Sequence, residues 1–319
     1  RRPPRSTLPP TLCPCTTLFR SDGGFARYRL EVRPWLALLA HGRRSRVWQD
    51  QSLVQIVESV FERYAGVAQW RWADDVAEHL AQSPFLGSGS GSASLGTRSY
   101  TVQYRETDLA FVARLLAAEA IGWRSEQDDA APAGHALVLF ANSPSETSCP
   151  EDISSTAGAG IRFHRASSQE RSDAIQAFGG QRVLQSAATS VLSWDYKAKR
   201  SVAASVPTHH AFGGEHAPRL ESYDHAGAYA FAGTAQAQRA ATLLQEAIEA
   251  RNKTWLGRST VRTFAPGHSF DLTESPLDAL GALGQGQAQG EDDHRFLLTA
   301  VTHAGINNLP QQLSDALLN

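Results

Sequence analysis

The sequence contains no methionine in 319 residues, and it begins with Arg-Arg-Pro-Pro. A complete translated chain normally begins with methionine, so we expect this chain to be a fragment of a longer protein. Cysteine is also scarce, with Cys13, Cys15 and Cys149 as its three examples. An odd number of irregularly spaced cysteines does not make a disulfide framework, and this favours folding in a reducing cytosol.

An excess of one charge and long hydrophobic runs are missing as well. The 30 basic and 32 acidic residues give a formal net charge of −2, so no basic field indicates nucleic acid or an anionic membrane as a partner. The apolar run 35–40 is far shorter than the roughly 18 residues that a membrane helix needs. The basic, proline-rich start also lacks the apolar core of a signal peptide.

Charged residues make up 19% of the chain, below the roughly 25% of typical soluble domains. This fits a protein that buries surface against partners, although a sequence rich in glycine and alanine gives the same figure. The length allows two domains with cores of their own.

The first residues differ in character from the rest. Thr11–Ser21, TLCPCTTLFRS, closely resembles the conceptual translation of a common sequencing adapter, and the alternative is an ordinary Pro/Thr-rich loop. The sequence becomes well patterned at Phe25. We therefore interpret 1–24 as a non-native or disordered leader, which would make two of the three cysteines foreign. An uninterrupted native reading frame through 11–21 would contradict this interpretation.

From Phe25 the pattern predicts a strand over Tyr28–Leu36 and a helix over Ser52–Ala65. Asp50 or Ser52 can cap this helix, and Gly66 can end it. Arg43, Arg44 and Arg46 lie between the two elements, and a solvated turn explains them better than an anion site. Residues 69–80 fit a strand or a helix equally well.

Arg98–Trp123 is the most clearly patterned segment. Tyr100, Val102 and Tyr104 alternate with polar residues, which predicts a strand. Thr107 can cap the helix that follows, and Gly122 can end it. We expect the apolar face of this helix to be buried; it comprises Leu109, Phe111, Val112, Leu115, Leu116 and Ala120.

The rest of the chain is rich in predicted strands. They cover 136–140, 183–194, 201–206, 255–263, 269–272 and 295–303, with a long helix over 234–251. This order predicts an α+β fold of β-barrel-like domains with inserted helices, because regular strand–helix alternation is lacking. The expected divisions are a first-barrel remnant with its helix (25–86), a Gly/Ser linker (87–97), an inserted α/β segment (98–180), a second barrel-like domain (181–306) and a truncated tail (307–319).

One cluster of side chains could bind a metal. His209, His210, Glu215, His216, Asp224 and His225 carry the groups that ligate zinc. Phe212-Gly213-Gly214 interrupts any helix that would place two histidines on one face, so we favour loop histidines in a solvated hairpin. Stoichiometric zinc binding in a titration would reverse this preference.

No other constellation defines a reaction. Cys149 lacks a local partner signature, no GxSxG elbow occurs, and the glycines Gly284, Gly286 and Gly290 are not followed by a phosphate-binding lysine. The paired carboxylates are best explained as solvated faces or turns; they are Asp74-Asp75, Asp128-Asp129 and Asp292-Asp293. We therefore predict no catalytic residue, no metal ligand and no cofactor, and expect that the chain is not an enzyme.

Five segments, in order, resemble the VgrG-type spike proteins of type VI secretion systems, which are related to phage late-control and tail-hub proteins. The two best are YRLEVRPWLALLAHGRRSRVWQDQSLVQIVESVF (28–61) and RSYTVQYRETDLAFVARLLAAEAIGW (98–123). The others are VLSWDYKAKRS (191–201), GRSTVRTFAPGHSFDLTESP (257–276) and FLLTAVTHAG (296–305). Each is moderately specific, and their shared order makes the resemblance strong.

The resemblance implies a mechanical function. In that family this region is the hub-like base of a homotrimer, with two barrel-like domains per chain, that caps a hexameric tube protein of the Hcp type. Further C-terminal parts carry a PAAR-type tip protein and effectors. The resemblance also implies synthesis in the bacterial cytoplasm and secretion through the type VI machine without a signal peptide, with a membrane only as the target of puncture and no nucleic acid as a partner.

The chain departs from the family pattern at both ends. Residues 1–24 do not match the family's first strands, so we expect an incomplete first barrel in which 28–36 is an unpaired or poorly paired edge strand. The needle-forming domains that normally follow are absent from the sequence. The main alternative is the tail hub of a contractile phage or prophage. An enzyme would need an effector domain beyond Asn319, and a zinc-dependent binding module rests on the histidine cluster alone.

Overall fold

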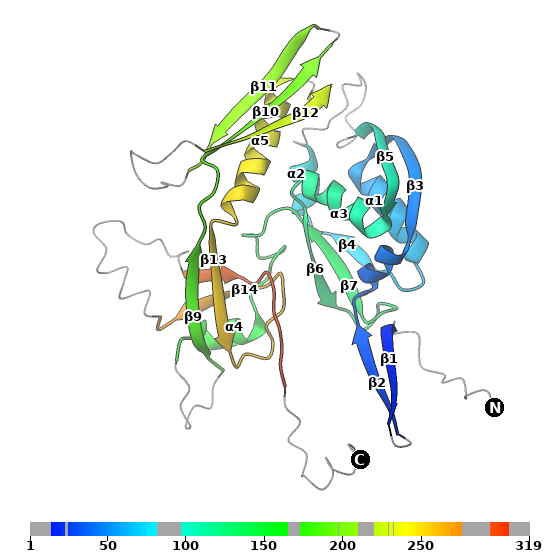
Figure 1. Cartoon of the computed structure of the whole chain (residues 1–319). Helices are drawn as coiled ribbons and strands as arrows, with labels where there is room; N and C mark the ends of the chain where they lie inside the picture. The colour runs from blue at the N-terminus through cyan, green and yellow to red at the C-terminus, as the bar shows by residue number, and fades with distance from the viewer. Residues whose placement is uncertain are drawn as a thin grey trace, which may run out of the picture.

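The computed structural model describes residues 14–22, 25–81, 97–164, 173–196, 198–209, 220–228, 230–231, 233–275 and 294–305. Within these ranges helices alternate with six small sheets of two or three strands each, which confirms an α+β fold. None of these sheets closes into a barrel. Figure 1 shows two halves: α1, α2 and α3 lie with β3–β7 in one, and α4 and α5 lie with β8–β14 in the other.

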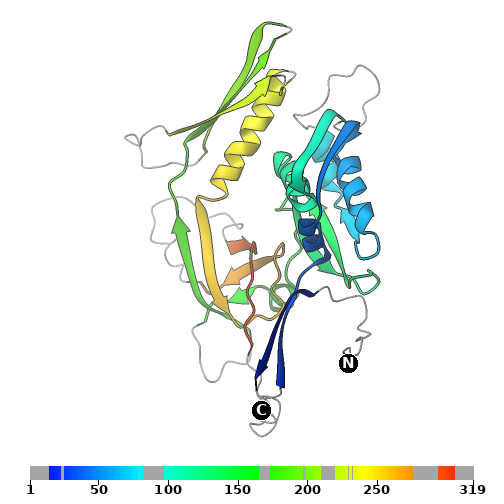
Figure 2. The same cartoon turned by 45° about the vertical axis from the view of Figure 1, so that its right-hand side comes forward.

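The first two strands form a hairpin. Strand β1 (Pro14–Asp22) pairs antiparallel with β2 (Phe25–Val32), and the two make a sheet of their own. In Figures 1 and 2 this hairpin extends away from the helices of its half. Residues 14–22 therefore form a strand, so 28–32 is not unpaired; β2 is nevertheless an edge strand, because its sheet contains only these two strands.

Strand β2 also ends before the predicted boundary at Leu36. Pro34 precedes a 3-10 helix, η1 (Trp35–His41), and Trp35 and Leu39 from this helix enter the core. Proline cannot donate a ladder hydrogen bond, which explains why the strand stops near it. The apolar residues after Pro34 thus belong to a helical turn and not to the strand.

Helix α1 (Leu53–Phe61) begins as the sequence predicts. Ser52 caps it: the Gln55 amide N–H donates to Ser52 Oγ at 3.2 Å, and the Ser52 amide N–H donates to Gln55 Oε1 at 2.9 Å. This reciprocal pair is a capping box, and it selects Ser52 over Asp50. The helix then tightens into the 3-10 turn η2 (Glu62–Tyr64), four residues earlier than the predicted α-helix would end at Ala65.

Helix α3 (Asp108–Ala118) confirms the predicted cap, because the Ala110 amide N–H donates to Thr107 Oγ1 at 3.1 Å. Its buried face is the expected one, except that Leu109 is half-buried and Ala120 lies outside the helix. The predicted stop at Gly122 was wrong. Ala120 takes the left-handed conformation after the helix, with φ 54°, and Gly122 opens the next strand. A Cβ at Gly122 would lie 2.8 Å from the Phe140 ring.

The first half is completed by a three-stranded sheet. Strand β7 (His135–Phe140) pairs antiparallel with β6 (Gly122–Gln127) and parallel with β4 (Trp70–Trp72). Helix α2 (Asp75–Ala81) follows β4, so residues 69–80 contain both elements that the sequence left open. Strand β3 (Arg43–Ser52) pairs antiparallel with β5 (Thr97–Thr107) as a separate ribbon over α1 and α3.

The second half contains three small sheets. Strand β10 (Ala188–Asp195) lies between β11 (Arg200–Pro207) and β12 (Glu221–Ala228), and β9 (Ile175–Arg182) pairs with β13 (Lys253–Ser259). Strand β14 (Ser269–Thr273) lies between β15 (Arg295–Leu297) and β8 (Ile161–Arg162), near α4 (Ile153–Gly158).

Helix α5 (Thr234–Glu249) covers one face of the β10–β12 sheet. Its small residues Ala237 and Ala241 pack against Val191 and Val202, which allows a close approach of helix and strands. The predicted helix at 234–251 is thus confirmed, with its end two residues earlier, at Glu249. No helix in the described ranges combines the length and the apolar character needed to cross a bilayer.

Candidate interaction surface on the β3–β5 ribbon

The β3–β5 ribbon turns its apolar side chains outward. Tyr100, Val102 and Tyr104 are exposed, Tyr104 to 69%, whereas the polar Thr101 and Gln103 between them are buried. Val47 stands opposite Val102 in the ladder and is also exposed. The strand that the sequence predicts is therefore confirmed, and its apolar side chains face away from the core. We call Val47, Tyr100, Val102 and Tyr104 the outer face.

The inner face is fixed by Trp48. This residue is buried, its ring stacks on Phe111 of α3 at a centroid distance of 4.8 Å, and its indole N–H donates to Ser59 Oγ at 3.0 Å. A slip of one residue in register would expose Trp48, because neighbouring strand residues point to opposite faces. The large aromatic contact thus holds the outer face in its exposed orientation.

A β-bulge interrupts the ribbon. Arg44 pairs with Glu106 and Arg46 with Gln103, so Ser45 alone stands opposite Tyr104 and Arg105. Arg105 takes a left-handed conformation with φ 50°, and its amide N–H donates to Ser45 Oγ at 3.2 Å. Bulges of this kind redirect side chains. Here Tyr104 and its neighbour Arg105 are both exposed.

Beside the bulge lies a basic cavity of about 390 Å³, lined by Arg43, Arg44, Ser45 and Arg105. Arg43 Nε donates to the Arg105 carbonyl at 2.6 Å, which orders the first guanidinium. The Arg105 guanidinium carbon lies 5.9 Å from the centre of the Tyr104 ring, so the cavity adjoins the outer face. We call this cavity the arginine pocket. Two of the arginines interpreted from the sequence as a solvated turn, Arg43 and Arg44, thus converge with Arg105 of β5.

A buried carboxylate on the core side of the ribbon holds one arginine of the pocket in place. Asp108 is fully buried and accepts three hydrogen bonds: from Arg44 Nε at 3.1 Å, from the Tyr64 hydroxyl at 3.0 Å and from Gln103 Nε2 at 2.8 Å. Burial, and then the Asp108 carboxylate, raises the pKa of Tyr64 from its ordinary value of 10.0. This network holds Arg44 in the pocket wall and also explains why the polar Gln103 faces inward.

The residues that the sequence suggests as metal ligands or catalytic groups either form no cluster in the structure or lie outside the described residues. His209 and Asp224 are exposed and His225 lies on β12, whereas 210–219 and 276–293 fall outside the described ranges. Within those ranges no group of three or more His, Cys, Asp or Glu side chains could hold a metal ion. Cys149 is buried, and burial raises the pKa of its thiol, so the group stays protonated and unreactive.

The carboxylate pairs are structural where the chain is described. Asp75 accepts from the Asn142 amide N–H at 2.7 Å and from Ser148 Oγ at 2.8 Å, so it holds the 141–148 loop and does more than lie on a solvated face. Asp128 accepts from the Ala130 amide N–H at 2.9 Å, as expected for a turn. Among the described residues, these carboxylates therefore stabilise a loop and a turn.

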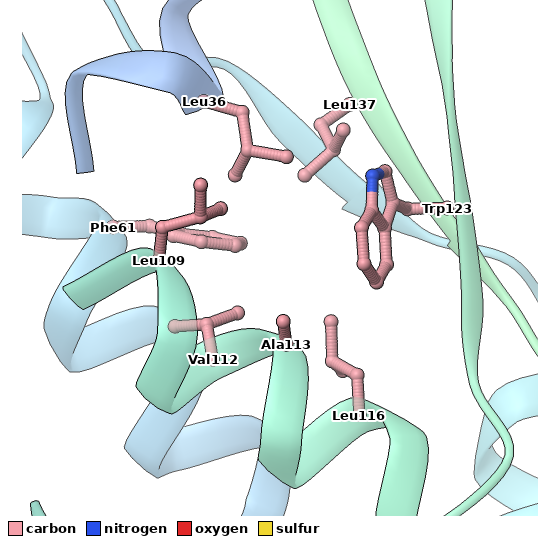
Figure 3. A pocket seen from close by; sticks show the side chains of 8 residues that line it. All are labelled: Leu36, Phe61, Leu109, Val112, Ala113, Leu116, Trp123 and Leu137. Carbon is pink, nitrogen blue, oxygen red and sulfur yellow. The ribbon is translucent and has the colours of Figure 1, made fainter. Parts of the chain in front are cut away.

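A second gap lies within the core of the first half. Figure 3 shows α3 side chains, among them Val112 and Leu116, pointing toward Leu36, Leu137 and Trp123 from the elements opposite. The space leaves no room for a water molecule. It is a packing feature of the core and not a binding site.

The sequence does not reveal which face of β5 is exposed. Alternation does not say which face of β5 is buried, and in the structure the contacts of Gln103 with Asp108 and of Trp48 with Phe111 decide it. Together, an exposed apolar sheet face, an adjoining basic pocket and the lack of a reactive cluster in the described ranges define a protein that acts through contacts.

Comparison with known proteins shows the family to which the chain belongs. A family model described as the phage tail baseplate hub (GPD) matches residues 16–309, and the chain belongs to this family. The match begins inside the segment Thr11–Ser21 that resembles an adapter. The family is a structural one without enzymatic activity, in agreement with the sequence-based expectation.

Curated relatives come from Pseudomonas aeruginosa. The type VI secretion system spike protein VgrG1b is 28% identical over 263 residues, covering 81% of this chain and 31% of its own length. The spike protein VgrG5 is 25% identical over 307 residues, covering 95% of this chain and 33% of its own length. The chain thus spans about a third of the length of these relatives.

A solved structure has a similar fold. The tail protein from Neisseria meningitidis MC58 aligns with a TM-score of 0.50 and 11% identity, covering 81% of this chain and 68% of the other. At this identity the likeness concerns the fold alone. It agrees with the tail-hub family to which the chain belongs.

Proposed function

We propose that the chain forms part of the base of a type VI secretion spike, a homotrimeric hub that caps a hexameric tube protein and carries the puncturing tip and effectors. The observation that carries this proposal is the similarity to two spike proteins over 81% and 95% of the chain. In such a base the work is mechanical. Sheath contraction drives the spike, and the hub transmits the load through packed cores and interfaces.

The local chemistry supports this role. Several charged groups of the first half form ion pairs that tie elements together, such as Arg98 with Glu119 at 2.8 Å and Arg71 with Glu126 at 2.6 Å. The outer face offers apolar area of the kind that marks interaction sites on soluble proteins. Both features suit a component that assembles with other chains.

We further propose that the small sheets correspond to barrel-like domains that assembly completes. The divisions at 25–86, 87–97, 98–180, 181–306 and 307–319 stay a prediction, as does the foreign origin of 1–24. Limited proteolysis followed by mass spectrometry tests them: early cuts should fall within 87–97. Early cuts within β10 or α5 instead would contradict the proposed second domain.

The same architecture could serve a phage or prophage tail, and the family description favours keeping this alternative. The two machines differ in the tube that the hub caps and in the route of the protein. As a spike base, the chain would be made in the bacterial cytoplasm and exported by the machine itself. As a tail hub, it would stay in the phage particle.

Binding to purified tubes separates the two functions. The chain is mixed with hexameric tube protein from the secretion locus of its genome, or with the tail tube protein of a prophage, and the mass of the complex is measured by light scattering. The proposal expects three chains per hexameric ring. Binding to the phage tube alone would favour the alternative, and binding to neither would overturn both.

A further inference from the structure

The second half carries an exposed apolar sheet face of its own. On the β10–β12 sheet the side covered by α5 contains Val191 and Ser193, whereas Trp194 and Tyr223 are exposed, Tyr223 to 59%. Ser190 pairs with Tyr223 and Ala188 with Glu221 in the parallel ladder of β10 and β12. Partners in such a ladder share a face, so Tyr223 and Glu221 lie on the side away from α5. We call Trp194, Glu221 and Tyr223 the β12 face.

The two faces lie on opposite sides of the chain. Figure 1 shows the β10–β12 sheet at the top and the β3–β5 ribbon at the right, with α5 and α3 between them. Because the two exposed apolar faces point away from each other, they cannot bind each other within one chain. It can, however, pair each face with the unlike face of another copy, which gives head-to-tail association.

The charges of the two faces are complementary. The pocket beside the outer face holds three guanidinium groups, of which Asp108 offsets one, and among the described residues neither Arg43 nor Arg105 has an ion-pair partner. The β12 face carries the carboxylate of Glu221, which accepts a hydrogen bond from Ser190 at its own surface. Arginine binds carboxylates with two parallel hydrogen bonds, so this acid matches the pocket in chemistry.

We propose that the outer face and arginine pocket of one copy bind the β12 face of the next copy, with Glu221 in the pocket and Tyr223 against Tyr104 and Val102. This inference rests on the proposed homotrimer, and it names the surfaces that build it. Tyrosine and arginine are the residues that dominate the energy of protein interfaces, and both are present here. Head-to-tail contacts form a closed ring when the rotation between copies allows it, and the proposed homotrimer requires closure at three copies, with first and second halves alternating.

Disulfide trapping between two different variants detects such a contact even when it is weak. Cys13 and Cys15 are replaced by serine, and Val102→Cys is made in one preparation and Tyr223→Cys in another. The two are mixed under oxidised glutathione, with a mass tag on one chain. Because the contact joins unlike faces, the mixed dimer should form at least ten times faster than either dimer of one variant with itself.

The matched control pairs Tyr223→Cys with Ser143→Cys, an exposed position on a loop of the first half. A mixed dimer from Val102→Cys that forms no faster than this control would overturn the inference. So would preferential trapping of Val102→Cys with itself, since that result would show a contact between like faces. Tube binding by the unmodified chain is measured separately, so a failure here leaves the proposed function intact.

Charge exchange tests the role of the pocket. Arg105→Glu in the Val102→Cys copy should reduce the trapping rate about tenfold, and Glu221→Arg in the Tyr223→Cys copy should restore it when both are present. Arg63→Glu, at an exposed position on η2, is the control and should leave the rate unchanged. Equal rates for Arg105→Glu and Arg63→Glu, or no restoration by the exchanged pair, would contradict the placement of Glu221 in the pocket.

Discussion

At the scale of single residues, Asp108 connects the core to the surface. It lies in the first turn of α3, where the helix dipole favours a negative charge, and it accepts from Arg44, Tyr64 and Gln103. Three donors from three different elements therefore depend on one carboxylate. Such a network is costly to break, because each buried donor then lacks a partner.

Asp108→Ala should lower the free energy of unfolding by about 2–3 kcal/mol, because it leaves the buried Gln103 amide unsatisfied and releases Arg44. Urea unfolding followed by tryptophan fluorescence measures the change. Asp129→Ala, at an exposed position, serves as the control and should stay within about 0.5 kcal/mol of the parent. Equal stability of the two variants would show that the network does not support the fold.

We expect Tyr64 to lower the free energy of unfolding of the chain at high pH. Its pKa is raised in the folded chain by burial and by Asp108, so the folded state holds the phenolic proton more tightly than the unfolded state. The stability that it contributes is complete below the unfolded value of 10.0 and is lost as the pH rises through the folded value. Tyr64→Phe should therefore lose less stability above pH 10.0 than the parent chain, as measured by urea unfolding along a pH series. Parallel losses in both proteins would contradict the assignment.

At the scale of elements, α3 depends on one buried face. Leu116 is fully buried in the first core, together with Phe111, Val112 and Leu115. Leu116→Asp should destabilise the chain by about 4 kcal/mol or more, because the new charge has no partner there. Ala117→Asp places the same charge one residue later on the exposed side and is the matched control. Thermal unfolding by circular dichroism compares them, and similar midpoints would refute the assigned face.

The elements that the sequence predicts best are those with local signals. Ser52 and Thr107 form their caps with residues three positions away, so the starts of α1 and α3 can be predicted from a short window. The end of α3 depends on Ala120 adopting a left-handed conformation, which alanine rarely does, and glycine at 122 is explained by its contact with Phe140 instead. Spacing alone could not reveal this.

The candidate site was harder to predict because it depends on distant partners. Arg44 and Arg105 are far apart in the sequence, and only the β3–β5 register and its bulge bring them to one pocket. The face that β5 turns outward is decided by Trp48 on Phe111 and by Gln103 on Asp108. Because of these contacts, the polar side of β5 is buried and its apolar side is exposed, the reverse of the usual arrangement.

At the scale of the whole molecule, one contact between the two halves joins side chains on helices. Arg239 of α5 approaches His79 of α2 with Nη2 3.1 Å from Nδ1, and Nε2 of His79 lies 2.6 Å from the carbonyl of Glu119. If the arginine donates to Nδ1, the proton of His79 is on Nε2 and is donated to Glu119. The chain of contacts thus joins α5, α2 and the end of α3.

Arg239→Ala should loosen this junction. Amide hydrogen exchange in α2 is expected to accelerate about fivefold, equivalent to a loss of about 1 kcal/mol, while exchange in the distant β9–β13 pair stays the same. Arg251→Ala, at the exposed end of the same helix region, is the matched control. Acceleration by both variants alike, or by neither, would show that Arg239 does not couple the halves.

The outward-facing β5 strand has a consequence for the chain before it meets any partner. Its segment Tyr100–Tyr104 combines high strand propensity with a lack of charge, which is the composition of aggregation-prone peptides. Arg98 and Arg105 flank it on both sides and act as gatekeepers against stacking with other strands. Assembly and aggregation therefore compete for the same surface, and the concentration at which the chain is made sets which of the two prevails.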